Sequence, residues 1–336
     1  YLERGGISSI NPVVDITNYV LLETGQPLHA FDKDKIHGNV SVRKAIKDES
    51  LMMINHQEII FSGEELVIAD QSGPLALAGI MGGLLSSSQE GTTNIFLESA
   101  YFDPITVRKS AKRHSLNTDA SFRFERGIDP NITEYALKRA ANLIVEIAGG
   151  KVTSEIVDLY PTKIEDFQVF LSYEKMDKLI GTEIPRETVK NILASLDIQF
   201  NNVTDGGVGL TIPSYRVDVS RDADVIEEIL RVYGYNNVEF SHKLNSSISF
   251  SEMNDVKFEN VVSNLLISQG FNETMANSLT KESYISLTET LNSDNNVHML
   301  NPLSSDLGVL RQSLLFSGLE SIIYNVNRSN KALKFF

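Results

Sequence analysis

The sequence predicts an α+β protein of several domains, and three observations support this. The chain has 336 residues, 42% of them hydrophobic, which is enough for two or three domains with separate cores. Short β-rich runs separated by turn-forming residues fill positions 40–102. Apolar residues at helical spacing precede and follow that region. We therefore expect a mixed β-sheet domain with helices at 1–163, a second domain at 164–239 and a third at 240–336.

The helices of the first domain are marked by their ends. Asn11-Pro12 is an N-cap followed by proline at the first helical position, and the apolar stripe after it stops before Gly25. The pairs Asp103-Pro104 and Asp129-Pro130 repeat that start. The helix that follows the second pair is predicted to end at Gly149-Gly150.

The strands of the first domain are predicted from β-branched and aromatic residues bounded by turn-formers such as Ser62-Gly63. The predicted strands lie near 40–43, 51–54, 58–61, 66–69, 75–78 and 94–97.

The second domain has a different order of elements. The pattern predicts a strand at 169–171, helices at 173–179 and 185–196, strands at 198–200 and 208–212, and a helix at 222–233. Helices followed by a small hairpin indicate a winged-helix-like domain. The third domain is predicted to begin with a helix near 256–268 and to continue with β-rich segments.

Composition and missing motifs exclude several classes of protein. No apolar stretch approaches the ~20 residues of a membrane span, so we expect a soluble, cytoplasmic protein. The chain has no Cys, which excludes disulfides and thiolate zinc sites. The phosphate-binding loop, the dinucleotide fingerprint and the Gly-x-Ser-x-Gly elbow are missing, and the six His are scattered. Because the sequence begins at Tyr1 and ends in Phe335-Phe336, we expect a piece of a longer chain.

The charge distribution allows only a local contact with nucleic acid. The net charge of −14 argues against a general nucleic-acid coat, because phosphate affinity is built from Lys and Arg. The densest basic run is 108–114, with Arg123 and Arg126 close behind it. Residues four apart in that run share a helix face, so the run is either an RNA contact or a solvated helix face.

Two groups of carboxylates are candidates for a site. Asp224, Glu227 and Glu228 share one side of a predicted helix start, and Asp218 precedes them. Acids gather in this way either because they favour a helix N-terminus or because they hold a hard cation such as Mg²⁺. Glu98 lies among apolar residues of a predicted strand, where it either faces water or serves as a buried recognition group.

Three segments resemble the bacterial phenylalanyl-tRNA synthetase β chain family. Residues 18–32 (NYVLLETGQPLHAFD) resemble one segment, and the short Gly79–Gly83 turn also resembles the family. Residues 113–127 (RHSLNTDASFRFERG) are similar to the family's Arg-His-x-Leu-x-Thr-Asp-Ala-Ser-x-Arg-x-Glu-Arg-Gly stretch. Residues 213–228 (PSYRVDVSRDADVIEE) match a third segment, and the resemblance spans nearly the whole chain in family order.

The resemblance implies that the first domain is an editing domain, which deacylates Tyr attached to tRNA(Phe). It places five residues in the pocket, with two more nearby. These residues are His29, Gly82, Glu98, Thr118 and Ala120, with Thr17 and Asn18 close by. Phe and Tyr differ by one hydroxyl, and a site built to bond that hydroxyl discriminates better than an apolar pocket does. We expect Glu98 to accept the tyrosine hydroxyl proton.

The expected chemistry is attack of water on an aminoacyl ester, which needs positioning and oxyanion support. We hypothesise that Gly82-Gly83 supplies backbone donors, while His29 and Thr118 orient water or the terminal ribose. His29 as a general base is a weaker hypothesis, because no residue in the sequence is identified as its partner. The alternative for His29 is a structural role at a corner between a helix and a strand.

The resemblance also gives the acidic residues and the third domain a role. It implies that Asp218, Asp224, Glu227 and Glu228 are ligands of a Mg²⁺ shared with the α chain. Residues 301–306 and 310–314 resemble the start of an antiparallel, class II synthetase-like but non-catalytic core. The implied partners are tRNA(Phe), mischarged Tyr-tRNA and the α chain of an α2β2 assembly, with ATP and phenylalanine bound by the α chain. The alternative is a non-catalytic tRNA-binding and assembly module, inactive without the α chain.

Overall fold

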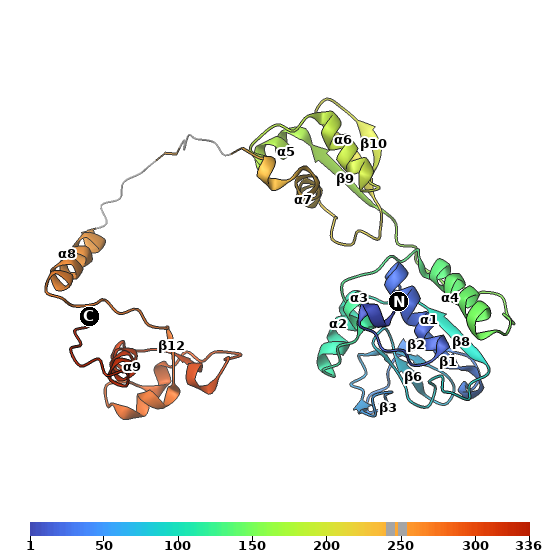
Figure 1. Cartoon of the computed structure of the whole chain (residues 1–336), viewed down its shortest axis with the longest axis horizontal. Coiled ribbons are helices and arrows are strands. Elements are labelled where there is room, and N and C mark those ends of the chain that lie inside the picture. The colour runs from blue at the N-terminus through green and yellow to red at the C-terminus, as the bar shows by residue number, and fades with distance from the viewer. Residues whose placement is uncertain (240–245, 248–253) are drawn as a thin grey trace. The chain divides into compact units, whose positions relative to one another are not determined.

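The computed structural model describes residues 1–239, 246–247 and 254–336 (Figure 1). The chain forms two compact units, Tyr1–Ser241 and His242–Phe336. Among the described residues, no helix combines the length and the hydropathy that crossing a membrane requires.

Helix α1 (Pro12–Thr24) confirms the first prediction from its two ends. The Asn11 side chain accepts a hydrogen bond from Val14 N at 2.9 Å, and proline occupies the first helical turn. Gly25 ends the helix at φ 79°, a left-handed conformation that glycine adopts without steric cost. The short 3₁₀ helix Glu3–Gly5 precedes α1.

Every strand pairing within residues 1–239 is antiparallel, so the mixed sheet expected in the first domain is wrong. Short connections join β3 to β4, β5 to β6 and β6 to β7, and tight turns join only antiparallel neighbours. The four-stranded sheet has the order β2 (Ser41–Lys44), β5 (Leu66–Ala69), β6 (Pro74–Leu77) and β7 (Met81–Gly82). Two further pairs are β3 (Ser50–Met52) with β4 (Glu58–Ile60), and β1 (Leu28–Asp32) with β8 (Ile95–Ser99).

Three helices follow β8. Helix α2 (Pro104–Arg113) begins at the predicted cap, where Asp103 accepts from Thr106 N at 2.8 Å. Helix α3 (Asp119–Phe124) follows, and α4 (Thr133–Ala148) ends before Gly149 as predicted. The predicted start of α4 at Asp129-Pro130 is wrong. The Asp129 carboxylate instead accepts from Asn131 N at 2.9 Å, which closes a turn before the helix.

The β1–β8 ribbon has two different faces. Leu28 and Leu97 pack against a core of α1 and α4 residues, and Figure 1 shows these two helices beside the ribbon. Side chains alternate along a strand, so His29 and Phe31 point to the opposite face. Phe31 is fully buried there in the main core of the domain. The ribbon therefore separates two cores and turns His29 away from α1 and α4.

The second part of unit 1 confirms the predicted order of strand, two helices, hairpin and helix. Its elements are β9 (Phe167–Ser172), α5 (Tyr173–Ile180), α6 (Arg186–Ser195), β10 (Gln199–Val203), β11 (Gly207–Ile212) and α7 (Asp222–Tyr233), with a 3₁₀ turn at Tyr235–Asn237. The antiparallel sheet has the order β10-β11-β9. Its core is separate from those of the first part.

Unit 2 contains less sheet than the sequence suggests. Helix α8 (Asn254–Ser268) confirms the predicted helix, and α9 (Leu315–Val326) comes late in the chain. The only strands among the described residues of this unit are β12 (Leu279–Thr280) and β13 (Val309–Leu310), which pair with each other. Short 3₁₀ helices and loops fill the span between them. The β-rich prediction is therefore wrong, because the apolar residues there are scattered and do not alternate over a strand's length.

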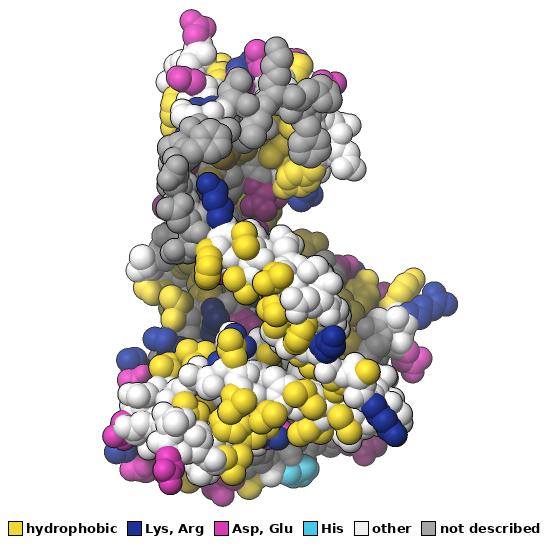
Figure 2. Space-filling view, turned by 90° about the vertical axis from the view of Figure 1, so that its left-hand side faces the viewer, with side chains coloured by type: hydrophobic (Ala, Val, Ile, Leu, Met, Phe, Trp, Pro, Cys, Tyr) yellow, Lys and Arg dark blue, Asp and Glu magenta, His cyan; other side chains and the backbone are white. Residues whose placement is uncertain are grey.

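Many apolar side chains of unit 2 face solvent. On α9 they include Leu315, Leu319, Ile322, Ile323, Tyr324 and Val326, all more than a third exposed. Hydrophobic side chains also cover much of the face seen in Figure 2. Exposed apolar surface of this extent marks an interaction surface.

A buried carboxylate fastens the β4–β5 connection to the end of α2. The Glu65 side chain is fully buried and accepts hydrogen bonds from Arg113 Nη1 at 2.9 Å and from Ser62 N at 3.0 Å. His114 Nε2 lies 3.0 Å from the same carboxylate. Burial alone raises the pKa of Glu65, but the hydrogen bonds from Arg113, Ser62 and His114 outweigh it and lower the pKa to about 2.

We predict that Glu65→Gln lowers the free energy of unfolding by about 2–4 kcal/mol, because it leaves Arg113 without its buried partner. The wild-type advantage is full above the ordinary pKa of 4.5 and is lost as the pH falls toward 2. Chemical denaturation between pH 3 and 7 measures it. Glu64→Gln is the control, since that carboxylate is 71% exposed and lies 3.5 Å from the same arginine. Equal effects of the two variants would contradict the assignment.

Candidate functional site

Antiparallel pairing of β1 with β8 brings two of the predicted site residues together. His29 lies directly opposite Glu98, and Phe31 lies opposite Phe96. Directly opposed residues project from the same face of a sheet, so the imidazole and the carboxyl group are neighbours. This face is the one turned away from α1 and α4.

His29 packs against the backbone of the next sheet. A Cβ built on Gly82 would lie 2.5 Å from His29 Cε1 and 2.7 Å from Nε2, so only glycine fits beneath this ring. The His29 ring also meets Phe31 edge to face, with centroids 4.4 Å apart. Its Nε2 is buried without a hydrogen-bond partner among the described residues. Burial lowers the pKa of His29 to about 4, so the imidazole is neutral at neutral pH.

Glu98 is the second titratable group on this face. Burial raises the pKa of its carboxyl group to about 8, with no neighbouring charge to oppose the shift. No hydrogen bond among the described residues involves this carboxyl group, although the residue keeps some contact with solvent. Glu98 is therefore half-buried, between the buried and the outward positions that the sequence allows. Below pH 8 the group is a neutral acid that can donate one hydrogen bond and accept others.

Gln26 was not identified from the sequence, although it lies in the 18–32 segment beside His29. It is fully buried, and its Nε2 donates to Pro27 O at 2.9 Å and to Ala100 O at 2.8 Å. These two carbonyls lie next to the paired ends of β1 and β8. Gln26 thereby fixes the register that sets His29 against Glu98. A fully buried amide just after the C-cap glycine has no sequence signature of its own.

The Gly82-Gly83 turn is less available than predicted. Gly83 N already donates to Leu75 O at 2.8 Å, so it is not free to bind an oxyanion. In the β6–β7 register Gly82 lies opposite Ala76, and the alternation of an antiparallel ladder turns its N–H away from β6. Of the two glycines, only Gly82 has an N–H that is not used in pairing with β6.

Thr118 holds the site in place through its backbone contacts. Its hydroxyl donates to Ile80 O at 2.8 Å and accepts from Ser121 N at 3.1 Å, which caps α3. The single donor of the hydroxyl is thus used by the turn that carries Gly82, and the predicted contact to water or ribose could use only its remaining acceptor position. Ala120 is partly buried against the main core near that cap.

Thr17 and Asn18 lie on α1, which packs on the other face of the ribbon. Thr17 is buried, and its hydroxyl donates to Val14 O of the same helix at 2.8 Å. No hydrogen bond among the described residues joins either residue to His29 or Glu98. The structure brings His29, Glu98 and Gly82 together, with Thr118 one turn away through Ile80.

The acidic residues of the second part do not form a cation site in this structure. Asp224 accepts from Arg221 Nη2 at 2.7 Å and from Arg221 N at 2.9 Å, and the side-chain bond lowers its pKa to about 2. Glu228 accepts from Arg231 Nη2 at 2.7 Å and from Arg216 Nη1 at 3.2 Å, and chiefly the Arg231 contact lowers its pKa.

The remaining two predicted ligands, Asp218 and Glu227, are exposed. Within the described ranges, no three His, Asp or Glu side chains converge as a metal site. The residues present therefore do not fit the expected Mg²⁺, because arginines already occupy the two best-placed carboxylates.

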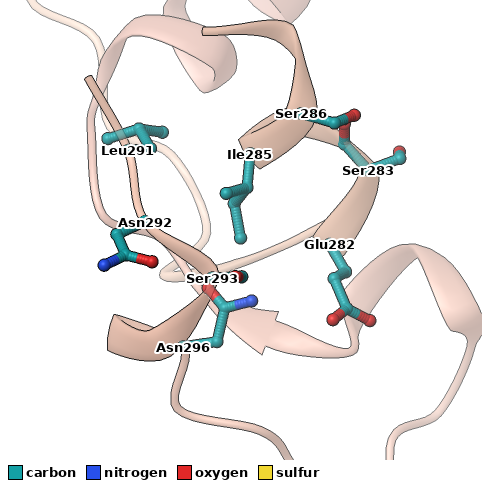
Figure 3. Close-up of a pocket in the computed structure, with 8 residues that line it drawn as sticks. All are labelled: Glu282, Ser283, Ile285, Ser286, Leu291, Asn292, Ser293 and Asn296. Atoms are coloured by element: carbon teal, nitrogen blue, oxygen red, sulfur yellow. The ribbon is translucent and has the colours of Figure 1, made fainter. Parts of the chain in front are cut away.

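A hollow of about 640 Å³ lies in unit 2, away from the predicted site residues. In Figure 3, Ile285 projects into it among polar side chains. Its lining consists of Glu282, Ser283, Ile285, Ser286, Leu291, Asn292, Ser293 and Asn296. None of the residues predicted from the sequence contributes to it.

Comparison with known families accounts for nearly the whole chain. Residues 1–149 match the B3/4 domain, residues 169–235 the tRNA synthetase B5 domain, and residues 245–336 the phenylalanyl tRNA synthetase beta chain CLM domain. The phenylalanine–tRNA ligase β subunit of Bacteroides thetaiotaomicron is 51% identical over 334 residues. This chain belongs to the phenylalanine–tRNA ligase β subunit family.

Other members of the family give the same result. The β subunits of Porphyromonas gingivalis and Legionella pneumophila are 45% and 40% identical in alignments of 339 residues that cover 100% of this chain. The B. thetaiotaomicron alignment covers 98% of this chain. The chain spans about 41% of the length of the curated relatives it matches.

A solved N-terminal fragment of the Pyrococcus horikoshii β subunit is a more distant match. It is 16% identical and aligns with 66% of this chain and 65% of its own, at a TM-score of 0.34. The family's three domains, B3/4, B5 and CLM, follow one another here as an α+β chain of helices and antiparallel sheets.

We predict that Gly82→Ala destabilises the chain by about 1–3 kcal/mol, because the new methyl group overlaps the His29 ring. In a His29→Ala background the same change should cost much less, since the ring is gone. Chemical denaturation of both single variants and the double variant measures this coupling. Gly91→Ala is the control, because open space surrounds its Cβ position. Additive effects of the two site substitutions would show that the ring and the turn are not in contact.

We predict that millimolar Mg²⁺ leaves the melting temperature of this chain unchanged, whereas Glu228→Gln lowers its stability by about 1–2 kcal/mol with or without the ion. The cause is loss of the carboxylate that joins Arg216 to Arg231. Glu227→Gln, an exposed neighbour on the same helix, should change stability little. Scanning calorimetry measures the effect of Mg²⁺ and the effect of each substitution. If Mg²⁺ stabilised wild type and Glu228→Gln abolished that stabilisation, the ion-pair role would be contradicted.

Proposed function

We propose that this chain is the part of a phenylalanine–tRNA ligase β subunit that hydrolyses mischarged Tyr-tRNA(Phe), and that residues 1–163 form the editing domain. The observation that carries the proposal is the pairing of His29 with Glu98 on one half-buried face of the β1–β8 ribbon, above Gly82. A buried carboxyl group without a partner in the chain is suited to receive one from a ligand.

Selectivity for tyrosine follows from the unpaired carboxyl group of Glu98. A tyrosine hydroxyl would donate a hydrogen bond to this carboxyl group or accept one from it, whereas phenylalanine would leave the donor and the acceptor of the carboxyl group unsatisfied. The difference amounts to about 1–3 kcal/mol for a neutral buried group. A site that bonds the extra hydroxyl therefore spares correctly charged Phe-tRNA.

The chemistry is attack of water on the aminoacyl ester, with the ribose oxygen as the leaving group. His29 has a pKa of about 4, which makes it a weak general base at neutral pH. Its role is to shape the pocket and, through the unpaired Nε2, to orient water or ribose. The Gly82 N–H is the proposed donor to the developing oxyanion, and Thr118 positions the turn that carries it.

The other domains serve the assembly in this proposal. Residues 164–239 form a winged-helix-like domain, and residues 240–336 begin a class II synthetase-like, non-catalytic core. That core would pack against the catalytic α chain, which binds ATP and phenylalanine, in a cytoplasmic α2β2 ligase that charges tRNA(Phe). The exposed apolar face of α9 supports such a contact. A Mg²⁺ shared with the α chain is proposed only for the assembled ligase, because Arg216 and Arg231 hold Glu228 in this chain.

The same apolar face favours a second candidate function. The chain would then act as a non-catalytic module that binds tRNA and assembles the ligase, with an editing pocket inactive without the α chain. Deacylation of Tyr-tRNA(Phe) by the chain alone and by the α/β assembly distinguishes the two functions.

We predict that Glu98→Ala slows deacylation of Tyr-tRNA(Phe) by about tenfold or more and abolishes the preference for Tyr over Phe, because the hydroxyl loses its partner. Glu98→Gln should retain much of the preference below pH 8, since an amide also donates and accepts. The measurement is release of radiolabelled amino acid from each charged tRNA, in the α/β assembly. Glu58→Ala, an exposed carboxylate on β4, is the control.

The pH dependence of stability tests the protonation state of Glu98 without an activity assay. Its pKa in the folded chain is about 8, above the ordinary value of 4.5. Wild type should therefore lose stability relative to Glu98→Gln as the pH rises from 4.5 to 8, and the difference should be constant above 8. A flat difference between pH 5 and 9, together with unchanged deacylation by Glu98→Ala, would exclude Glu98 from the site.

A further inference from the structure

A second hollow, of about 540 Å³, lies within unit 1 and is separate from the His29–Glu98 face. It is bounded by the end of α1, by α3 with the connection to α4, and by one residue of the second part. The lining residues are Thr24, Gly25, Phe122, Arg123, Arg126, Gly127, Ile128, Asp129, Ile132 and Tyr215. We call it the Arg126 cleft. Four of the ten lining residues come from the 113–127 segment, of which the editing proposal uses only Thr118 and Ala120.

Aromatic side chains form part of the wall of the Arg126 cleft. Phe122 is 48% exposed, and the Arg126 guanidinium carbon lies 3.6 Å from the centroid of its ring. Tyr215 is 41% exposed. A guanidinium stacked on a ring offers its outer face to a further planar group, and nucleic-acid bases stack on both Arg and aromatic surfaces. Phe122 and Arg126 thus form a stacking platform at the solvent side of the protein.

Two arginines, Arg123 and Arg126, line the cleft in a chain whose net charge is −14. Arg123 pairs with Asp119 at 3.2 Å, and Arg126 pairs with Glu125 at 2.6 Å. Exposed pairs of this kind contribute about 0–1 kcal/mol, so a phosphate can replace the carboxylate at little cost. Asp129 is the one carboxylate in the lining, and it accepts a hydrogen bond from Asn131 N.

Contacts between the two parts of unit 1 hold the wall in place. Gly127 has φ 88°, and a Cβ there would lie 2.8 Å from Val217 Cγ1, so only glycine allows this approach. Asn131 Nδ2 donates to Ser214 Oγ at 3.0 Å. The cleft is therefore formed before any ligand binds, which lowers the entropy cost of binding.

We propose that the Arg126 cleft binds an unpaired RNA strand, with a base stacked on the Phe122–Arg126 platform and the neighbouring phosphate held by Arg123. Stacking groups and cations side by side suit single-stranded RNA, whereas an acidic peptide would need the cations alone. Exposed Arg108, Lys109 and Lys112 on α2, which packs against α3, extend the basic surface. That the strand belongs to tRNA(Phe) rests on the proposed function.

The test is fluorescence anisotropy with a labelled single-stranded RNA dodecamer and with uncharged tRNA(Phe), at several salt concentrations. Phe122→Ala and Arg126→Gln should each weaken binding about fivefold or more. Arg123→Gln, which removes the proposed phosphate contact, should also reduce the slope of log affinity against log salt by about 0.7. Arg43→Gln is the control, because Arg43 also pairs with a half-buried carboxylate, Glu49, but lies on β2 outside the cleft.

Three outcomes would overturn the proposal. They are no measurable RNA binding by wild type at low salt, unchanged binding by the cleft variants, and equal competition by polyglutamate, which would show recognition of charge alone. Thermal unfolding of each variant checks that it folds, and Arg123→Lys, which keeps the charge, should retain most of the affinity.

The editing proposal is tested separately by hydrolysis of 3′-O-tyrosyl adenosine, which carries no phosphate and no second base for the cleft to bind. Cleft variants should hydrolyse this ester at the wild-type rate while they bind RNA weakly. Loss of hydrolysis in Glu98→Ala with unchanged RNA binding would show that the two sites are independent. Failure of wild type to hydrolyse the ester would contradict the editing function. The RNA-binding measurements would still test whether the cleft binds RNA.

Discussion

The register of the β1–β8 ribbon is the constraint on which the candidate site depends. A shift of one residue would turn His29 and Glu98 toward α1 and α4, and would bring Leu28 and Leu97 to the opposite face. Two features oppose such a shift. Leu28 and Leu97 are held in a core of their own, and Gln26 bonds the carbonyls of Pro27 and Ala100 at the end of the ribbon.

This register places two groups of unmet hydrogen-bonding capacity side by side. His29 is kept neutral by burial, and so is Glu98 at neutral pH, since their pKa values move to about 4 and about 8. Among the described residues, His29 Nε2 is buried without a hydrogen-bond partner, and the half-buried Glu98 carboxyl group makes no hydrogen bond. Unsatisfied buried groups cost stability, and proteins retain them where a ligand completes the bonding. The main core and the Glu65 anchor supply the stability that such a site requires.

Arginine has three different uses along the chain. Arg113 neutralises a buried carboxylate inside the first domain, and Arg216 and Arg231 hold Glu228 in the second. Arg126 instead lies on an exposed aromatic ring, where its Nη1 donates to Phe122 O at 2.9 Å and pairs with Glu125. The first two uses fix the fold, because each arginine satisfies a charge that is largely out of water. The third leaves the guanidinium free to exchange its partner, which suits a binding surface.

The sequence by itself determined the local elements. Asn11 with Pro12 and Gly25 bounded α1, and the strand, helices and hairpin of the second part appeared in the predicted order, because caps, turns and periodicity act over a few residues. The family motifs identified the candidate residues, but not their state. Only the tertiary structure paired His29 with Glu98, used the Thr118 hydroxyl and Gly83 N–H in the scaffold, and engaged Asp224 and Glu228 with arginines. Strand register, burial and ion pairing arise from residues far apart in the chain, so no local pattern could determine them.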